Sequence, residues 1–427
     1  MAVLNGLYAR EILDGTGNPT IECTVWSDSG FVAASSAASS TRVSPHAKQQ
    51  LSDGNYQHLM GQGVLESITF LNEVVRPACI GKDPLDQGSF DSFLQELEAA
   101  AEKPIDPRAL LAVSQAVLKL AALVTDTPLY YYIQQQYQLV GELFLPDSIA
   151  SIASGGLFGT DNLDFAEFLL LPASHLPYPE EVNAIYTIFA QFKAILLSKN
   201  AIYATGPTGA YVPNLYGNSD VFELLIEAVK QTTYTFAQDL FFGITADAQL
   251  FANRGKYTLK DKHESYTPKE MIEYYTRLRS LYHVTYIEDP FSEEDAKWWQ
   301  ALTTELGKTT LVASNRSHGS NPEQIALLAQ ERHSNAVVIE LPHQGTITAT
   351  LAAIASARQN QQKIILSIAD RETNDDFLAD FAVGVGSDYF KSGAPNRGEN
   401  IAKYNRLLQI YEEIQYQTAT SQSYVAP

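Results

Sequence analysis

The sequence has little cysteine and little positive charge. Cys23 and Cys79 are the two cysteines among 427 residues; no disulfide framework or zinc site can be derived from them, so we expect a reduced, cytoplasmic setting. Lys and Arg number 29 against 49 Asp and Glu, giving a net charge of −20. Nucleic-acid grooves and anionic membrane surfaces are bound by basic patches, so we expect neither as a partner.

Several motifs and segments are also missing. No G-x-G-x-x-G or Walker-type loop occurs, which leaves a nucleotide cofactor unsupported. The eight histidines form no H-x-x-x-H or Cys/His cluster that would indicate zinc. The first residues lack a basic segment followed by an apolar run, so we expect no secretory signal. No apolar stretch reaches the ~20 residues that span a bilayer.

The first third of the chain is typical of an α+β domain. Hydrophobic residues make up 45% of the chain and charged residues 18%, as in well-packed globular proteins. We predict an N-terminal domain over residues 1–140 that begins with strands and continues with helices. Its predicted elements are strands at 8–13 and 20–26, a small polar run at 35–44 expected to be a mobile loop, and helices at 62–80, at 107–125 and from 126.

Beyond residue 140 short apolar strands alternate with helical segments, which predicts a closed β/α barrel over residues 141–415. In such barrels the chemistry lies at the C-terminal ends of the strands. Residues 416–427 are polar and are predicted to be a frayed tail. The predicted strands are 167–171, 241–245, 283–287, 310–313, 336–341 and 364–367, and the helices include 219–237, 268–281 and 344–358.

Long collinear segments resemble the enolase family. Residues 367–380 are similar to its signature S-H-R-S-G-E-T-E-D-x-x-I-A-D, and residues 9–22 to its opening A-R-E-I-L-D-S-R-G-N-P-T-V-E. Residues 401–408 resemble the closing I-A-K-Y-N-Q-L-L, and segments 286–291 and 344–346 match further blocks. The resemblance implies an α/β fold in which an N-terminal α+β domain precedes a TIM-type barrel.

The metal positions implied by the resemblance are altered. Enolases hold a catalytic Mg²⁺ with one Glu and two Asp; here Glu288 is retained, whereas Thr245 and Ser314 stand at the other two positions. One carboxylate with two hydroxyls is a poor Mg²⁺ site, so we expect no cofactor. Asp247, two residues beyond Thr245, is an alternative ligand. Ser39 aligns with the loop serine that binds a second Mg²⁺ in the family.

The acid, base and phosphate positions are altered as well. Glu340 replaces the family's general-base Lys, and Thr208 replaces its acidic Glu. Phe158 replaces the mobile-loop His. In the signature, the His, Arg and second Ser are Ile368, Ala369 and Asp370, so the phosphate-binding arginine is absent.

Glu167 and Lys391 are retained family positions. Each also has a structural interpretation, because strand ends inside a barrel need polar partners and Lys391 can act as a counter-ion. Asp370 and the pair Asp375–Asp376 are most simply a solvated acidic loop. Since an unpaired buried charge is costly, we predict that Glu340 and Lys391 form an ion pair in the vacated site.

The leading hypothesis is an enolase-like pseudoenzyme without 2-phosphoglycerate dehydration activity, kept for binding, assembly or regulation with an unidentified protein partner or ligand. The alternative is a remodelled lyase of the enolase superfamily that uses the carboxylates of Glu167, Glu340, Asp370 and Asp247 on a neutral or cationic substrate. A diverged phosphopyruvate hydratase comes third. The resemblance also implies a homo-oligomer, a dimer, although the interface Glu–Arg pair of the family is here Glu22 and Gln409.

Overall fold

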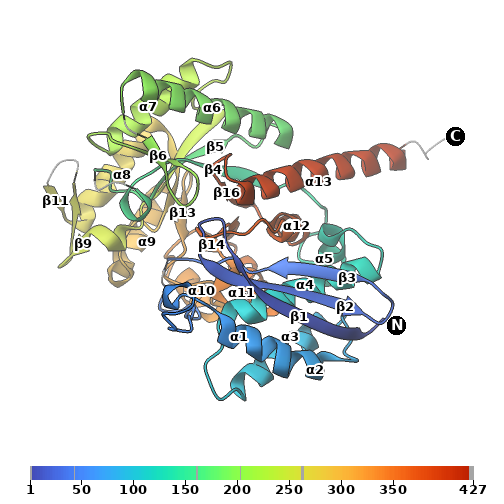
Figure 1. The fold of residues 1–427 in the computed structure, drawn as a ribbon. Helices are drawn as coiled ribbons and strands as arrows, with labels where there is room; N and C mark the ends of the chain where they lie inside the picture. The colour runs from blue at the N-terminus through green and yellow to red at the C-terminus, as the bar shows by residue number, and fades with distance from the viewer. Residues whose placement is uncertain (1, 43, 160–161, 202, 261–263, 423–427) are drawn as a thin grey trace.

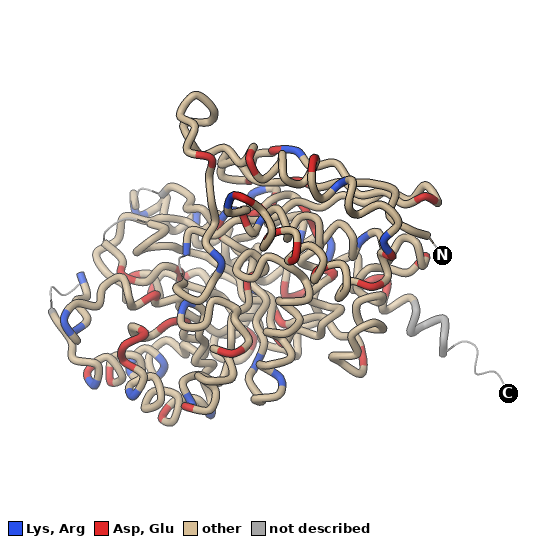
Figure 2. The backbone as a smooth tube through the Cα atoms, turned by 90° about the horizontal axis from the view of Figure 1, so that it is seen from below, with Lys and Arg blue, Asp and Glu red and all other residues tan. Residues whose placement is uncertain are grey.

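The protein folds into a sheet-and-helix domain beside a barrel (Figure 1). The computed structural model describes residues 2–42, 44–159, 162–201, 203–260 and 264–422. The C-terminal helix α13 extends outward past the body of the molecule (Figure 1). Acidic and basic residues are scattered over the whole backbone trace, and neither sign is confined to one part of the molecule (Figure 2).

The N-terminal domain is a three-stranded antiparallel sheet packed on helices. Strands β1 (Leu4–Leu13), β2 (Pro19–Ser27) and β3 (Val32–Ser36) lie in that order. Alternate residues such as Ile21, Cys23 and Val25 are buried, as expected for a sheet with one face on a core. Helix α4 (Pro107–Val124) contacts β2 and β3. It is long and apolar enough to cross a membrane, but it is the buried core helix of this domain.

The remaining helices of this domain follow the predicted periodicity. The pattern predicted at 62–80 forms three consecutive segments, because a π-helical stretch interrupts the α-helix. The helix predicted at 107–125 is α4, and the one predicted from 126 begins at Leu129. The bounds are η1 (Leu59–Gly61), α1 (Leu65–Phe70), η2 (Leu71–Val75), α2 (Arg76–Cys79), α3 (Gln87–Ala99) and α5 (Leu129–Tyr137).

Eight strands close the barrel through pairing of its last strand with its first. The fold class predicted from the sequence is confirmed. The second strand runs antiparallel to both neighbours, and the first and last strands were not among those predicted. The strands are β4 (Asp147–Ser154), β5 (Glu167–Pro172), β8 (Leu240–Thr245), β12 (Val284–Glu288), β13 (Leu311–Ser314), β14 (Ala336–Ile339), β15 (Lys363–Ser367) and β16 (Tyr389–Gly393).

Helices surround the barrel, and short strands extend from it. The helix predicted at 219–237 ends at Lys230, and the predicted tail is wrong as far as Gln422, because α13 continues to that residue. The helices are α6 (Tyr178–Ser198), α7 (Asn218–Lys230), α8 (Pro268–Tyr282), α9 (Ala296–Leu306), α10 (Pro322–Gln330), α11 (Ile347–Gln359), α12 (Phe377–Gly384) and α13 (Gly398–Gln422). The short elements are η3 (Gly156–Phe158), β6 (Tyr203–Thr205), β7 (Tyr211–Pro213), η4 (Ala248–Phe251), β9 (Ala252–Asn253), β10 (Lys256–Leu259), β11 (Glu264–Tyr266), η5 (Glu293–Asp295) and η6 (Leu341–His343).

The two domains share one hydrophobic core, which extends from the sheet to α11 and α12 of the barrel. Asp375 links them at its edge. Its carboxylate accepts hydrogen bonds from Ser35 Oγ at 2.6 Å and from Ser36 N at 2.9 Å, and pairs with Lys119 Nζ at 2.5 Å. The interpretation of Asp375 as part of a solvated loop is therefore wrong, whereas the neighbouring Asp376 side chain is 51% exposed.

We expect Asp375→Ala to destabilise the protein by about 1–3 kcal/mol, because it leaves the partly buried Lys119 ammonium and two hydrogen-bond donors without their acceptor. Asp376→Ala is the matched control: its exposed carboxylate lies 3.8 Å from the same ammonium, so its loss should cost less than about 1 kcal/mol. Urea unfolding of the two variants measures the difference. Equal stabilities would contradict the role given to Asp375.

Candidate functional site

Strand pairing brings three polar residues side by side at one end of the barrel. Thr245 ends β8 and Glu288 ends β12, and the two are register partners. Glu167 begins β5, which runs in the opposite direction, and it pairs with Thr245 from the other side. All three are buried. The reversed direction of β5 therefore places the first residue of that strand at the same rim as the last residues of its neighbours.

Lys391 lies between these residues. Its Nζ is 2.6 Å from Glu167 Oε2 and 2.7 Å from Glu288 Oε2, and it donates to Thr245 Oγ1 at 2.8 Å. The Thr245 hydroxyl is 3.0 Å from Glu288 Oε2 and 3.1 Å from Glu167 Oε2. The ammonium thus has three buried oxygen partners, and one lysine joins strands β5, β8, β12 and β16.

A second cation enters this site from the N-terminal domain. The arm, defined as residues 37–42 and 44–50 after β3, carries Arg42. Its Nη1 is 2.8 Å from Glu288 Oε1 and its Nη2 is 3.1 Å from Glu167 Oε2. The guanidinium carbon lies 5.2 Å from the centroid of the Phe158 ring, within the range of a cation–π contact. The Arg42 side chain is 11% exposed.

The arm is held to the barrel by hydrogen bonds. The backbones of Ser39 and Arg371 bond to each other in both directions, and Thr41 N donates to Asp370 Oδ1 at 2.8 Å. Ser44 Oγ donates to the carbonyl oxygen of Arg316 at 2.6 Å. The interpretation of Asp370 as part of a solvated acidic loop is wrong, since Asp370 is buried, and Ser39 in the run expected to be a mobile loop is buried as well.

The predicted ion pair between Glu340 and Lys391 is also wrong. Among the described residues, Lys391 pairs with Glu167 and Glu288, while Glu340 Oε1 lies 3.9 Å from Arg42 Nη1. Glu340 Oε1 instead accepts a hydrogen bond from Asn315 Nδ2 at 2.9 Å. Arg42 occupies the position beside Glu340 that the sequence-based prediction assigned to the lysine.

Because of the two cations, the three glutamates have different pKa values. Burial acts to raise the pKa values of Glu167 and Glu288, but Lys391 and Arg42 outweigh it and hold both below the usual value. Burial raises the pKa of Glu340 to about 7, and Arg42 opposes this only in part. Burial also lowers the pKa of the nearby His343 to about 4.

Ser314 and Asp247, the two further candidate metal ligands, have hydrogen-bond or ion-pair partners other than Glu288. Ser314 Oγ lies 3.0 Å from Ser334 Oγ, and Asp247 Oδ1 pairs with Arg316 Nη1 at 3.4 Å. Within the described ranges, no group of three or more His, Cys, Asp or Glu residues suits a metal ion. Both Glu288 oxygens already contact cations.

The rest of the rim is closed by side chains. A cavity of about 10 Å³ remains between Arg42, Lys391 and the replaced positions, which is room for about one water molecule. Its lining includes Phe158, Thr208, Glu340, Ile368 and Asp370. The backbone N–H of Ala369 donates to Glu372 Oε1 at 3.1 Å, so this N–H already has an acceptor within the chain.

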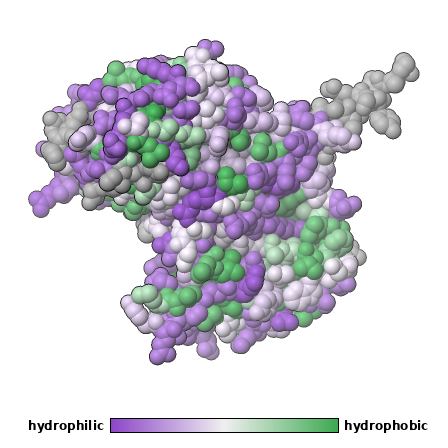
Figure 3. Space-filling model, turned by 45° about the horizontal axis from the view of Figure 1, so that its top comes forward, coloured by the Kyte–Doolittle hydropathy of each residue, from purple (hydrophilic) through white to green (hydrophobic). Residues whose placement is uncertain are grey.

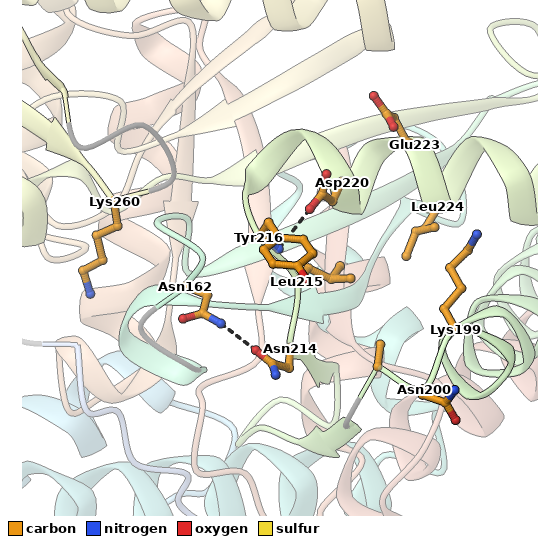
Figure 4. A pocket seen from close by; sticks show the side chains of 11 residues that line it. Asn162, Lys199, Asn200, Asn214, Leu215, Tyr216, Asp220, Glu223, Leu224 and Lys260 are labelled. Atoms are coloured by element: carbon orange, nitrogen blue, oxygen red, sulfur yellow. Dashed lines mark hydrogen bonds between the residues drawn. The ribbon is translucent and has the colours of Figure 1, made fainter.

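A larger cavity lies elsewhere, on the outside of the barrel. It has a volume of about 890 Å³. Tyr216 and Lys260 approach it from different segments, and Asn162 donates to Asn214, another residue of its lining (Figure 4). None of the residues that resemble enolase site positions lines it. This cavity is therefore not part of the site at the barrel rim.

Sequence reasoning missed Arg42 as a site residue. A signal was present: Arg42 is the only Asp, Glu, Lys or Arg between Asp28 and Lys48. A lone charge in a serine- and alanine-rich run is unusual enough to suggest a specific partner. The partners themselves lie more than 120 residues away along the chain, as the separations from Glu167 and Glu288 show.

We expect Glu340→Gln to flatten the dependence of stability on pH. A carboxyl whose pKa rises from 4.5 to about 7 on folding contributes fully below pH 4.5. That contribution is lost as pH rises through 7, so the variant should gain about 3 kcal/mol relative to the unchanged protein between pH 4.5 and 8.

Urea unfolding at several pH values measures this gain. Glu102→Gln, at an exposed position, is the matched control and should show none. Asp289 and Glu181, whose pKa values burial also raises to about 7, are unchanged in both variants and cancel in the comparison. A pH-independent difference for Glu340→Gln would contradict a buried titrating carboxyl.

Two protein-family models match the chain and together cover most of it. One is described as "Enolase, N-terminal domain" and matches residues 4–133. The other is described as "Enolase, C-terminal TIM barrel domain" and matches residues 142–424. The boundary between the two matches falls close to the predicted division at residue 140.

Proposed function

Since the chain belongs to the enolase family, we propose that it is a pseudoenzyme of that family, without 2-phosphoglycerate dehydration activity and retained to bind a ligand or partner. The single observation that carries the proposal is the pair of cations at the barrel rim. Arg42 and Lys391 contact both oxygens of Glu288 and also Glu167. Both cations therefore lie directly beside Glu288, the one retained metal-ligand position.

The donor set at this rim does not fit the Mg²⁺ of enolases. Mg²⁺ needs near-octahedral oxygen ligands at about 2.0–2.1 Å and gives up its water reluctantly. Thr245 and Ser314 offer hydroxyls where the family has carboxylates, and the Ser314 hydroxyl contacts Ser334. Two adjacent cations would repel a divalent ion, so metal binding would require both to leave.

The anion-binding and acid–base positions support the same proposal. Ala369 offers no charged side chain to a phosphate, and Asp370, which bonds to the arm through Thr41, would repel one. The Thr208 hydroxyl finds no hydrogen-bond partner among the described residues, and it is a poor proton donor for a leaving hydroxide. The cavity of about 10 Å³ is far too small for a phosphorylated three-carbon acid.

One observation favours the remodelled lyase as a second candidate. Glu340 has a pKa of about 7, which suits a general base at neutral pH. Its Oε2 atom finds no hydrogen-bond partner among the described residues. Such an enzyme would have to move the arm and Phe158 before a substrate could reach the carboxylate.

We expect no 2-phosphoglycerate dehydration and no tight Mg²⁺ binding. Glu340→Lys alone should not create activity. Catalytic groups that act as a unit restore the rate only when all of them are present, and here the metal and phosphate positions remain altered. A spectroscopic dehydration assay with excess Mg²⁺, run beside an active enolase, provides the measurement. Mg²⁺-dependent turnover by the purified unchanged chain would overturn the pseudoenzyme proposal.

The exposed side of the small sheet supports the expected homo-oligomer. Tyr8 of β1 and Val32 of β3 lie on the face of the sheet that points away from the core, and they are 52% and 58% exposed. Hydrophobic residues also gather in patches on the lower part of the surface in Figure 3. Within one chain, Glu22 pairs with Arg10 at 2.7 Å and Gln409 accepts from Arg406 at 3.3 Å. We place such an assembly in the cytoplasm, as the cysteine usage favours.

We expect a dimer in light scattering at micromolar concentration. Tyr8→Ser combined with Val32→Ser should weaken it, because both substitutions remove exposed apolar surface without disturbing the core. Tyr416→Ser, which changes a residue that is 71% exposed on α13, is the control. A monomer for the unchanged chain would contradict the proposal.

A further inference from the structure

The rim of the barrel forms a receptor with more negative than positive groups of its own. Glu167, Glu288 and Glu340 surround the Arg42 guanidinium and are all at most 2% exposed. The barrel itself supplies one cation to these carboxylates, Lys391. The second cation, Arg42, belongs to the arm of the other domain. The barrel therefore depends on a group from outside it to balance its buried charge.

The geometry of this receptor suits a planar guanidinium group. Two carboxylates contact different nitrogens of Arg42, at 2.8 Å from Glu288 and at 3.1 Å from Glu167. An aromatic ring, that of Phe158, lies 5.2 Å from the guanidinium carbon. A flat fork of donors that also contacts an aromatic ring is what distinguishes a guanidinium from an ammonium ion.

Arg42 fills the receptor incompletely. Its buried Nε finds no hydrogen-bond partner among the described residues, and neither does Glu340 Oε2. The third carboxylate stands 3.9 Å from the nearest arginine nitrogen, beyond hydrogen-bond distance. A ligand that is not tethered to the arm could shift toward Glu340 and satisfy that oxygen as well.

We infer, on the basis of the proposed binding role, that Arg42 is an internal substitute for a ligand that carries a guanidinium group. The ligand displaces the Arg42 side chain and binds between Glu167, Glu288 and Glu340, against Phe158. The group belongs either to a small guanidino compound or to an arginine side chain of a peptide. The arm competes with it in every unliganded molecule and lowers its apparent affinity.

The test is a calorimetric titration of Arg42→Ala with ethylguanidine. Because a tethered group competes at an effective concentration in the millimolar range, the variant should bind ethylguanidine at least about tenfold more tightly than the unchanged protein. Arg316→Ala is the matched control, since Arg316 is a neighbouring arginine that pairs with Asp247 instead. It should bind no more tightly than the unchanged protein.

Two further probes separate the chemical classes. Butylamine and Mg²⁺ should bind Arg42→Ala at least about tenfold more weakly than ethylguanidine, because neither presents a planar fork. A Gly-Arg-Gly amide peptide identifies the source: binding as tight as that of ethylguanidine indicates an arginine side chain, and no binding indicates a small guanidino compound. No ethylguanidine binding, or equal binding of butylamine, overturns the inference.

Arg42→Gln serves if Arg42→Ala does not fold, because its amide keeps donors near the carboxylates. If neither variant folds, the unchanged protein decides. Saturating ethylguanidine should then speed hydrogen exchange at Ser39 N, whose bond to the Arg371 carbonyl oxygen is 2.9 Å, and unchanged exchange overturns the inference. The dehydration assay on the same samples keeps the outcomes apart: turnover overturns the proposed function, whereas absent binding without turnover overturns only the guanidinium receptor.

Discussion

The arrangement of the barrel rim depends on the contacts of two cations with the buried carboxylates of Glu167 and Glu288. Removing a single member of such a network leaves an uncompensated buried charge, at a cost of about 3–5 kcal/mol. Lys391 and Arg42 lie on different domains, yet both contact Glu167 and Glu288. The charge balance of the barrel and the position of the N-terminal arm are therefore coupled.

This coupling explains why the arm lies against the barrel although its composition is typical of a loop. Serine and alanine give it little apolar area to bury, so packing alone would hold it weakly. The Arg42 ion pairs and the backbone bonds between Ser39 and Arg371 provide the attachment. Farther along the same interface, Asp375 fixes the end of β3 through Ser35 and Ser36. The closed rim is thus a property of both domains together.

The site could be predicted from the sequence only in part. The resemblance to the enolase family implied that Glu167, Thr245, Glu288 and Lys391 belong to one site, and the structure brings these four residues together at one rim of the barrel. The partner of Lys391 was predicted wrongly, since Glu340 and the lysine were considered as a pair without Arg42. Long-range ion pairs depend on side-chain reach and on competition among partners, and neither quantity is a local property of the chain.

The sequence by itself determined the fold class, the division into two domains and the residue types at the family positions, because periodicity and motif spacing are local and collinear. It also determined most strand and helix positions, with errors at ends such as Lys230 and in the C-terminal segment up to Gln422. Only the tertiary structure decided which charges pair, that Asp370 is buried, that Asp375 binds Lys119 and Ser35, and that Arg42 occupies the rim. Burial and charge pairing depend on what the rest of the chain brings to the same place, and no single segment encodes that.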